Sequence, residues 1–385
     1  MNKLEELIEK LCPNGVEYKK LGEFCEIKTG AGITKKDTVE NGKYKIISGG
    51  IEPLGLCNIC NRKPNTVTIA RAGSAGFVNY ITEDFYLNDK CFSIIPDDSI
   101  NRKFLYYALK KIQENIYSLK SSGTVPTVNT ERVANICIPV PPMDVQCEIV
   151  HILDNFTLLS AELSTELEAR KKQYEYYNYN LLKFENIPYY TLEELCDIVD
   201  YRGKTPKKTN EGIFLVTAKN IRKGYIDYEK SQEFISEQDY AEVMRRGMPK
   251  VGDVLITTEA PCGNVAQVDD ENIALAQRVI KYRPKDNRLD STFLKYILLG
   301  EEFQTKLNGK ATGGTVKGIK GSILHKLTIP LPSIEEQRKI VKILDRFNKL
   351  CNDISEGLPA EINARQKQYE YYRDKILTFK MIGDW

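Results

Sequence analysis

The sequence contains the stretch IPVPPMDVQCEIVHILDNF at residues 138–156 and a second version of it, IPLPSIEEQRKIVKILDRF, at residues 329–347. These two stretches are identical at 10 of 19 positions and lie 191 residues apart. A second pair, ARKKQYEYYNYNLLKF at 169–184 and ARQKQYEYYRDKILTF at 364–379, is identical at 10 of 16 positions. Two matched pairs in the same order indicate an internal duplication, with a period far too long for a solenoid.

Both copies predict a long amphipathic helix. Apolar residues recur every three or four positions from Ile149 to Phe184 and from Ile340 to Phe379, which is typical of a coiled-coil stripe. One such helix cannot bury its stripe alone. We therefore expect the two copies to pack on each other, antiparallel, about a pseudo-twofold axis. The alternative is that each helix packs only on its own globular domain.

The ends of these helices are marked by local signals. In the first copy we expect Asp144 to be the N-cap, and in the second copy Ser333 with Glu336 forms a capping-box pattern. Gly357 and Pro359 interrupt the second segment, so we expect a kink there, or a restart with Pro359 in a first turn.

The remaining sequence predicts two mixed α/β domains, because short strand-forming runs alternate with Gly, Asn and Pro and with a few helical patterns. The fold class is therefore α/β (α+β), with two such domains joined by two long antiparallel coiled-coil helices. We expect four segments: a first domain with an N-terminal helix at 1–140, a helix at 141–185, a second domain at 186–331 and a helix at 332–385.

The composition limits the function classes. The 385 residues include 55 Lys and Arg against 53 Asp and Glu, so the net charge of +2 excludes a globally basic coat but not local basic faces. No stretch approaches the roughly 20 apolar residues that a membrane span requires. The N-terminal residues form an amphipathic pattern and the ten cysteines are scattered, so we expect a cytoplasmic protein with reduced thiols and no membrane contact.

Motifs for catalysis are missing from the sequence. It has two histidines, His151 and His325, and neither is duplicated. It has no phosphate-binding GxxxxGK[ST] loop, no complete GxGxxG and no amino-methyltransferase tetrapeptide. A single Cys57-x-x-Cys60 does not supply the four ligands of a structural zinc site, so we expect no metal. Residues 73–76 predict a tight loop whose backbone N–H groups are open to an anion.

Basic and polar side chains gather in loops of both domains, where they have the chemistry of phosphate contacts and base-edge contacts. Ordinary solvated loops remain an alternative. The candidate DNA-binding residues of the first domain are Lys28, Thr29, Lys35, Lys36, Arg71, Ser74, Ser121 and Ser122. Those of the second domain are Arg202, Lys204, Thr205, Lys207, Lys208, Lys219, Asn220, Arg222, Lys310, Thr312 and Lys317.

The duplicated Gln-Tyr-Glu-Tyr-Tyr blocks place aromatic rings around the whole circumference of each helix, so Tyr176 and Tyr371 must point away from the helix pair. Exposed tyrosines beside arginine are typical of a protein interface. The candidate partner-binding residues are Tyr176, Tyr177, Tyr371, Tyr372 and Arg373.

The duplicated helix segments, together with the opening LIEKLCPNGVEYKKLGE, resemble the conserved regions of the specificity (S) subunit of type I restriction-modification systems. This resemblance covers the whole chain. It implies two target recognition domains, each of which recognises one half of an asymmetric bipartite DNA site. It also implies that the helix pair sets the spacing and docks two methyltransferase (M) subunits, and through them restriction (R) subunits.

The resemblance further implies that this subunit is not itself an enzyme and needs no cofactor. S-adenosylmethionine, ATP and Mg would be used by the partner subunits of a DNA adenine methyltransferase and restriction endonuclease complex. The alternative function is a coiled-coil protein-interaction scaffold with two globular binding ends and no DNA specificity.

Overall fold

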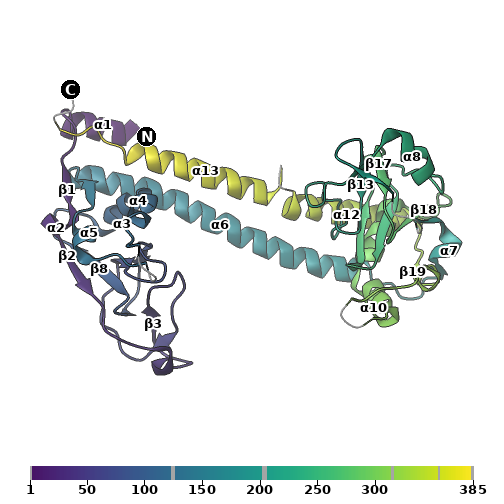
Figure 1. Cartoon of the computed structure of the whole chain (residues 1–385), viewed down its shortest axis with the longest axis horizontal. Coiled ribbons are helices and arrows are strands. Elements are labelled where there is room, and N and C mark those ends of the chain that lie inside the picture. The colour runs from purple at the N-terminus through teal and green to yellow at the C-terminus, as the bar shows by residue number, and fades with distance from the viewer. Residues whose placement is uncertain (1, 123–125, 202–205, 314–315, 354–355, 383–385) are drawn as a thin grey trace. The chain divides into compact units, whose positions relative to one another are not determined.

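The structure, a computed structural model, describes residues 2–122, 126–201, 206–313, 316–353 and 356–382 (Figure 1). The chain divides into two compact units. Unit 1 comprises Met1–Ser164 and Glu361–Trp385, and unit 2 comprises Thr165–Ala360. Each unit combines β-sheets with helices, so the prediction of a mixed α/β chain is confirmed. Helix α6 (Met143–Leu181, 39 residues) contributes its first part to unit 1 and its last part to unit 2.

Unit 1 is built on an antiparallel four-stranded sheet in the order β2-β8-β5-β6. Its strands are β2 (Cys25–Thr29), β8 (Cys91–Pro96), β5 (Thr66–Ala70) and β6 (Val78–Ile81). A second sheet contains β4 (Leu56–Cys57), β3 (Tyr44–Ile47) and β7 (Phe85–Leu87), and a two-stranded sheet pairs β1 (Tyr18–Lys20) with β9 (Cys137–Pro139).

The helices of unit 1 cover one face of the β2-β8-β5-β6 sheet. There Val67, Ile69, Phe92 and Ile94 of the sheet share a buried core with residues of α1, α3 and the first part of α6. The helical elements are α1 (Asn2–Leu11), α2 (Leu21–Phe24), a 3-10 turn at Lys35–Asp37, α3 (Arg102–Lys111), α4 (Gln113–Tyr117), α5 (Thr130–Ala134) and α13 (Leu358–Ile376).

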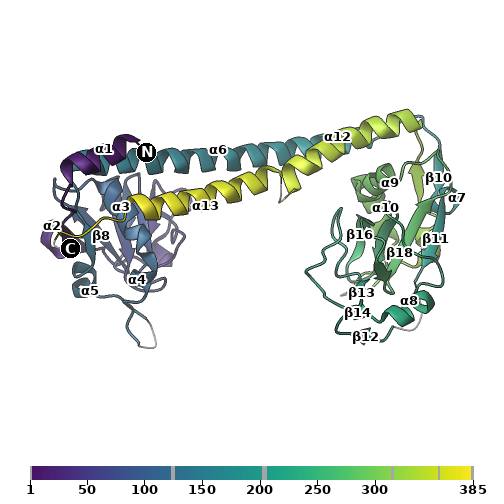
Figure 2. The ribbon, with the colours of Figure 1, turned by 90° about the horizontal axis from the view of Figure 1, so that it is seen from above.

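Unit 2 repeats this plan. Its antiparallel sheet has the order β11-β18-β15-β16, with β11 (Cys196–Asp200), β18 (Val279–Pro284), β15 (Val254–Thr258) and β16 (Cys262–Gln267). A second sheet contains β12 (Lys208–Thr209), β14 (Phe234–Ile235), β13 (Ile213–Val216) and β17 (Ile273–Leu275), and β10 (Tyr189–Thr191) pairs with β19 (Thr328–Pro330). Its helices are α7 (Leu192–Leu195), α8 (Glu237–Val243), α9 (Ser291–Leu299), α10 (Glu301–Lys310), α11 (Gly321–Leu324) and α12 (Ile334–Asn352). Figure 2 shows α9 and α10 beside β16, on which both pack.

The hydrogen-bond register shows that the two sheets are equivalent. Just beyond the last residue of β5, Arg71 N donates to Lys90 O at 2.7 Å, and at the last residue of β15 the equivalent bond joins Thr258 N to Arg278 O at 2.9 Å. The duplication therefore extends through domains whose sequences have diverged almost completely.

A buried glutamine ties the start of each long helix to its own domain. Gln146 Oε1 accepts from Asn101 N at 2.8 Å, and Gln146 Nε2 donates to Ser99 O at 2.9 Å and to Pro141 O at 2.7 Å. Gln337 of α12 makes the same three bonds in unit 2, at 2.8, 2.8 and 2.9 Å. Both side chains are fully buried, which explains why glutamine stands at this position in both copies.

The helices pack in pairs within each unit. In unit 1, Phe156 of α6 stacks on Tyr372 of α13 at 5.4 Å between ring centroids. In unit 2, the aromatic rings of Tyr174 and Tyr177 on α6 lie 6.4 and 5.3 Å from that of Phe347 on α12. Neither copy therefore packs only on its own domain, and that alternative is wrong. The pseudo-twofold arrangement of the whole chain and the four-segment division stay predictions.

The helix signals were partly correct. Ser333 caps α12 as predicted, because its hydroxyl accepts from Glu336 N at 3.3 Å. The second segment forms two helices, with Pro359 in the first turn of α13, as expected from the Gly357-Pro359 interruption. The expectation for Asp144 was wrong, because α6 already begins at Met143 and Asp144 lies inside its first turn. None of the described helices is long and apolar enough to cross a membrane.

Candidate nucleic-acid interface

Five predicted DNA-binding residues of unit 1 lie at one end of its main sheet, one as the last residue of β2 and four in loops. Because neighbouring strands are antiparallel, β2 and β5 end where β8 and β6 begin, and Thr29, Arg71 and Ser74 lie at this end. The loop that carries Ser121 and Ser122 joins them, since Ser121 N donates to Thr127 O and the next residue, Val128, donates from its N to Arg71 O, both at 2.9 Å. We call the segments that carry Thr29, Arg71, Ser74, Ser121 and Ser122 the unit 1 loop cluster.

A buried asparagine braces this loop cluster. Asn88 Oδ1 accepts from Ser48 Oγ at 3.1 Å and from Lys90 N at 3.0 Å, and Asn88 Nδ2 donates to Ile33 O at 2.8 Å. The Asn88 side chain is buried. One amide thus holds three loops in place, and it was missed because nothing in its local sequence distinguishes it from a surface turn residue.

Two glycines allow the loops to approach each other. A Cβ on Gly49 would lie 2.0 Å from Ala72 O, and a Cβ on Gly73 would lie 2.6 Å from Gly49 O. The prediction that the 73–76 loop opens its backbone N–H groups to an anion was wrong. Ser74 N donates to Gly49 O, and Gly76 N donates to Ala70 O, both at 2.7 Å.

The other three candidates of unit 1 lie outside this cluster. Lys28 is exposed on β2 and forms an ion pair with Glu26 at 2.7 Å. Lys35 and Lys36 are exposed in the 3-10 turn at Lys35–Asp37.

Unit 2 places two basic residues near the equivalent end of its sheet. Thr312 and Gly318 exchange two backbone hydrogen bonds of 2.9 Å, and Ile319 N donates to Thr258 O at 3.0 Å, at the end of β15. This pairing holds Lys317 exposed beside the sheet end, and Lys310 is the exposed last residue of α10.

A second basic loop of unit 2 follows β13. Lys219 is exposed, whereas Arg222 is half-buried and pairs with Asp227 at 3.2 Å. Asn220 has 0% exposure, and its amide bonds to Thr217 N and Oγ1, to Asp227 O and to Ser231 O. An amide that is buried and bonded at both ends shapes the loop and has no surface to offer to DNA, which corrects its assignment as a contact residue.

Two further candidates of unit 2 lie on or near β12. Lys207 and Lys208 are exposed, and Lys208 pairs with Glu233 at 2.7 Å. Arg202, Lys204 and Thr205 lie outside the described residues.

Two basic residues at these sheet ends were missed. Lys90 and Arg278 occupy the same register position in the two units, and both are exposed. Arg278 adopts φ +71°, an uncommon conformation for a residue with a side chain. Only the hydrogen-bond register reveals that these two residues are equivalent, because the sequences around them do not align.

The duplicated tyrosines form matching aromatic pairs. Tyr176 and Tyr371 are 65% and 63% exposed and point away from the helix pair, as predicted. Each lies edge-on to its neighbour, with ring centroids 5.6 Å apart for Tyr176 and Tyr177 and 5.4 Å apart for Tyr371 and Tyr372. Tyr177 and Tyr372 instead stack on the phenylalanine of the paired helix. Arg373 is half-buried and bonds to Asp374 at 2.8 Å.

Of the groups that could support catalysis or metal binding, His325 and Cys57 have structural partners. Tyr282 OH lies 2.8 Å from His325 Nδ1, and Cys57 Sγ donates to Ile59 O at 3.1 Å. Within the ranges that the structure describes, no group of three or more His, Cys, Asp or Glu side chains could hold a metal ion.

Comparison with known proteins agrees with this architecture. The family described as "Type I restriction modification DNA specificity domain" matches residues 13–170 and 185–364. A putative type I restriction enzyme specificity subunit of Haemophilus influenzae, S.HindORF215P, is 30% identical over 402 aligned residues that cover 98% of each chain. The EcoR124I/EcoR124II specificity subunit of Escherichia coli is 36% identical over 262 residues, 63% of each chain.

Solved structures share the fold. The S subunit of a type I restriction-modification system from M. genitalium has a TM-score of 0.61 at 18% identity, covering 94% of this chain and 96% of that one. With its two mixed α/β units and long paired helices, the chain therefore has the fold of an S subunit. The chain belongs to the type I restriction-modification DNA specificity family. In that family its role is DNA sequence specificity within a complex with other subunits.

Proposed function

We propose that the domains at 1–140 and 186–331 are target recognition domains, and that each recognises one half of an asymmetric bipartite DNA site. The helices at 141–185 and 332–385 set the spacing between the halves and dock two M subunits, through which R subunits assemble. The chain itself carries no catalytic group. S-adenosylmethionine, ATP and Mg²⁺ act in the partner subunits.

One observation carries this proposal: the two units share the same helix anchors and exposed tyrosines, and they differ in the loops at the ends of their sheets. The helix anchor at Gln146 and Gln337 and the exposed Tyr176 and Tyr371 are repeated in kind. Two similar surfaces suit two copies of one partner. The loops at the sheet ends differ, as two different half-sites require.

A domain replacement tests the proposal sharply. Strand pairs β1-β9 and β10-β19 have the same register, with Tyr18 opposite Pro139 and Tyr189 opposite Pro330. Replacing residues 189–330 by a second copy of 18–139 therefore joins equivalent positions. We expect the variant, coexpressed with its M subunit, to methylate adenines in a palindromic site made of two first half-sites.

The reciprocal replacement, two copies of 189–330, is the matched control and should give the other palindrome. Methylated adenines are mapped by single-molecule sequencing. If both variants methylate the asymmetric site of the parent chain, the domains do not determine the half-sites and the proposal is wrong.

A further inference from the structure

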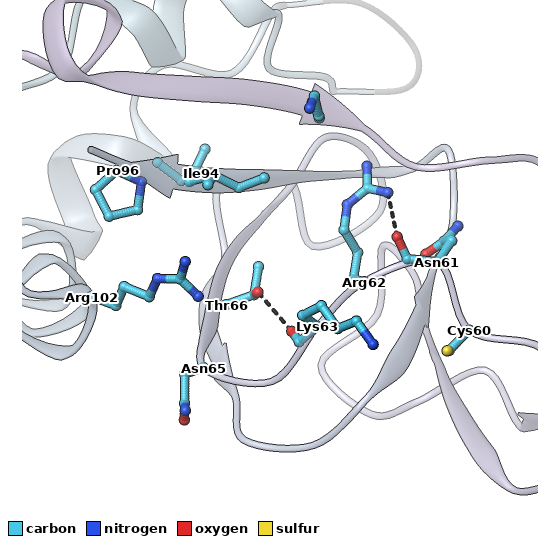
Figure 3. Close-up of a pocket in the computed structure, with 11 residues that line it drawn as sticks. Cys60, Asn61, Arg62, Lys63, Asn65, Thr66, Ile94, Pro96 and Arg102 are labelled. Carbon is cyan, nitrogen blue, oxygen red and sulfur yellow. Dashed lines mark hydrogen bonds between the residues drawn. The ribbon is translucent and has the colours of Figure 1, made fainter. Parts of the chain in front are cut away.

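Unit 1 contains a hollow of about 510 Å³ that is lined by four cationic side chains and no carboxylate (Figure 3). The cations are Lys28 of β2, Arg62 and Lys63 of the loop before β5, and Arg102 at the start of α3. Figure 3 shows Arg62 extending toward the strands and Arg102 beside Pro96 and Thr66. A concave site with this charge favours an anion.

Arg62 is held in place with donor capacity to spare. Its Nε donates to Ser93 Oγ at 2.8 Å, its Nη1 to Asn61 O at 2.8 Å and its Nη2 to Thr29 O at 2.9 Å. These bonds use three of the five N–H groups of a guanidinium, and all three acceptors are neutral. Burial lowers the pKa of Arg62 and the nearby charge of Glu26 raises it. The guanidinium is therefore fixed and partly desolvated, and it keeps donors for a ligand.

Lys63 and Arg102 supply exposed charge at the rim. Thr66 Oγ1 donates to Lys63 O at 2.8 Å, and Asn65 between them adopts φ +57°, which forms the tight turn that carries Lys63. The Lys63 side chain is 83% exposed and lies 3.6 Å from Asp84, so this ion pair is weak. Arg102 is exposed at the start of α3.

The fold does not require an open basic hollow here, because unit 2 has a buried, ion-paired carboxylate at the same position of its sheet. Matching strand registers make Asp253 and Lys281 equivalent to Thr66 and Ser93. There Asp253 bonds to Arg283 at 2.6 Å and pairs with the buried Lys281 at 3.4 Å. In unit 1 Thr66 stands in place of Asp253, and the carboxylates that reach the cations are Glu26, 2.7 Å from Lys28, and Asp84, 3.6 Å from Lys63. The lining of the hollow itself has no carboxylate.

We propose that this hollow binds a phosphodiester group of the DNA backbone beside the half-site that unit 1 recognises. The proposal rests on the proposed function. Arg62 links the hollow to the predicted contact loops, because its Nη2 bonds to Thr29 O, where β2 enters the unit 1 loop cluster. A rigid guanidinium fork with adjacent lysines is the usual protein partner of a phosphate.

The test uses the full chain in its complex with M subunits. The variant is Lys63→Gln with Arg102→Gln, two exposed residues whose loss leaves the Arg62 bonds intact. The control is Lys10→Gln with Lys20→Gln, two exposed lysines of unit 1 that do not line the hollow. We measure binding over a salt series to two duplexes, one that contains the recognition site mapped from the methylated adenines and one of unrelated sequence. Thermal melting checks the fold of each variant.

We expect the hollow variant to bind both duplexes about three- to tenfold more weakly and to lower the slope of log K against log salt by about 1. The control should match the parent. If the parent retains DNA and the hollow variant keeps its slope, the hollow is not a backbone site while the proposed function stands. If the parent complex retains neither duplex, the proposed function fails and the hollow assignment with it.

A titration with inorganic phosphate distinguishes a site for the phosphodiester groups of DNA from a site for a free phosphate ion. Phosphate that binds the parent and not the hollow variant, together with an unchanged DNA slope, would identify a free-anion site and overturn the assignment to DNA.

Discussion

Replacing Gln337 by leucine should destabilise unit 2 selectively. The buried amide accepts from Asp290 N at 2.8 Å and donates to Arg288 O and Pro332 O at 2.8 and 2.9 Å. Leucine has a similar size and keeps the site filled, but it removes all three bonds. At a net 0.5–1.5 kcal/mol for each bond, plus the desolvated groups left behind, the cost is about 3 kcal/mol.

Hydrogen exchange read by mass spectrometry resolves this cost by region, which matters because a chain with two units need not unfold in one step. A loss of about 3 kcal/mol corresponds to roughly 100-fold faster exchange of the most protected amides in β18 and α9. Those of β8 and α3 in unit 1 should keep the parent rate, and Gln146→Leu should give the reverse pattern.

The matched controls are Gln238→Leu and Gln366→Leu, which change exposed glutamines of unit 2 and unit 1 and should alter exchange little. If Gln337→Leu leaves β18 and α9 within about threefold of the parent, the amide is not the anchor that the three bonds indicate. Equal acceleration in both units would refute the independence of the two anchors.

Two further perturbations test the partner surface and the chain ends. Tyr176→Ala and Tyr371→Ala remove exposed rings, so each should lower retention of the M subunit in a pull-down while the melting temperature stays within about 1 °C of the parent. Retention that is unchanged in the double variant would exclude these rings from docking. Gly15 adopts φ +95°, and a Cβ there would lie 2.5 Å from Lys380 O, so Gly15→Ala should destabilise unit 1 by about 1–3 kcal/mol in urea unfolding. Unchanged unfolding would show that the junction of the two chain ends carries no stability.

The helical segments were predictable because their signals are local. The apolar period of three to four residues, the Ser333 cap and the break near Pro359 all depend on neighbours within one or two turns. The outward direction of Tyr176 and Tyr371 followed from the same period. Asp144 was misassigned because an N-cap residue precedes the helix, whereas α6 begins directly after Pro142, at Met143, and Asp144 is already helical.

The candidate site was less predictable, because residue type alone does not report burial. Asn220 has the composition of a base-contacting residue, and only its four internal hydrogen bonds show that it shapes a loop. Lys90 and Arg278 were missed for the opposite reason, since their common position depends on pairing between strands far apart in the chain.

Residue order alone established the duplication, the paired helices and the family resemblance, because each rests on repeated local patterns that survive divergence. Tertiary structure decided which loops meet at a sheet end, and that unit 1 has a basic hollow where unit 2 has the buried carboxylate of Asp253. The physical reason is that antiparallel register brings together residues separated by tens of positions. Whether a charge is free or neutralised depends on those distant neighbours.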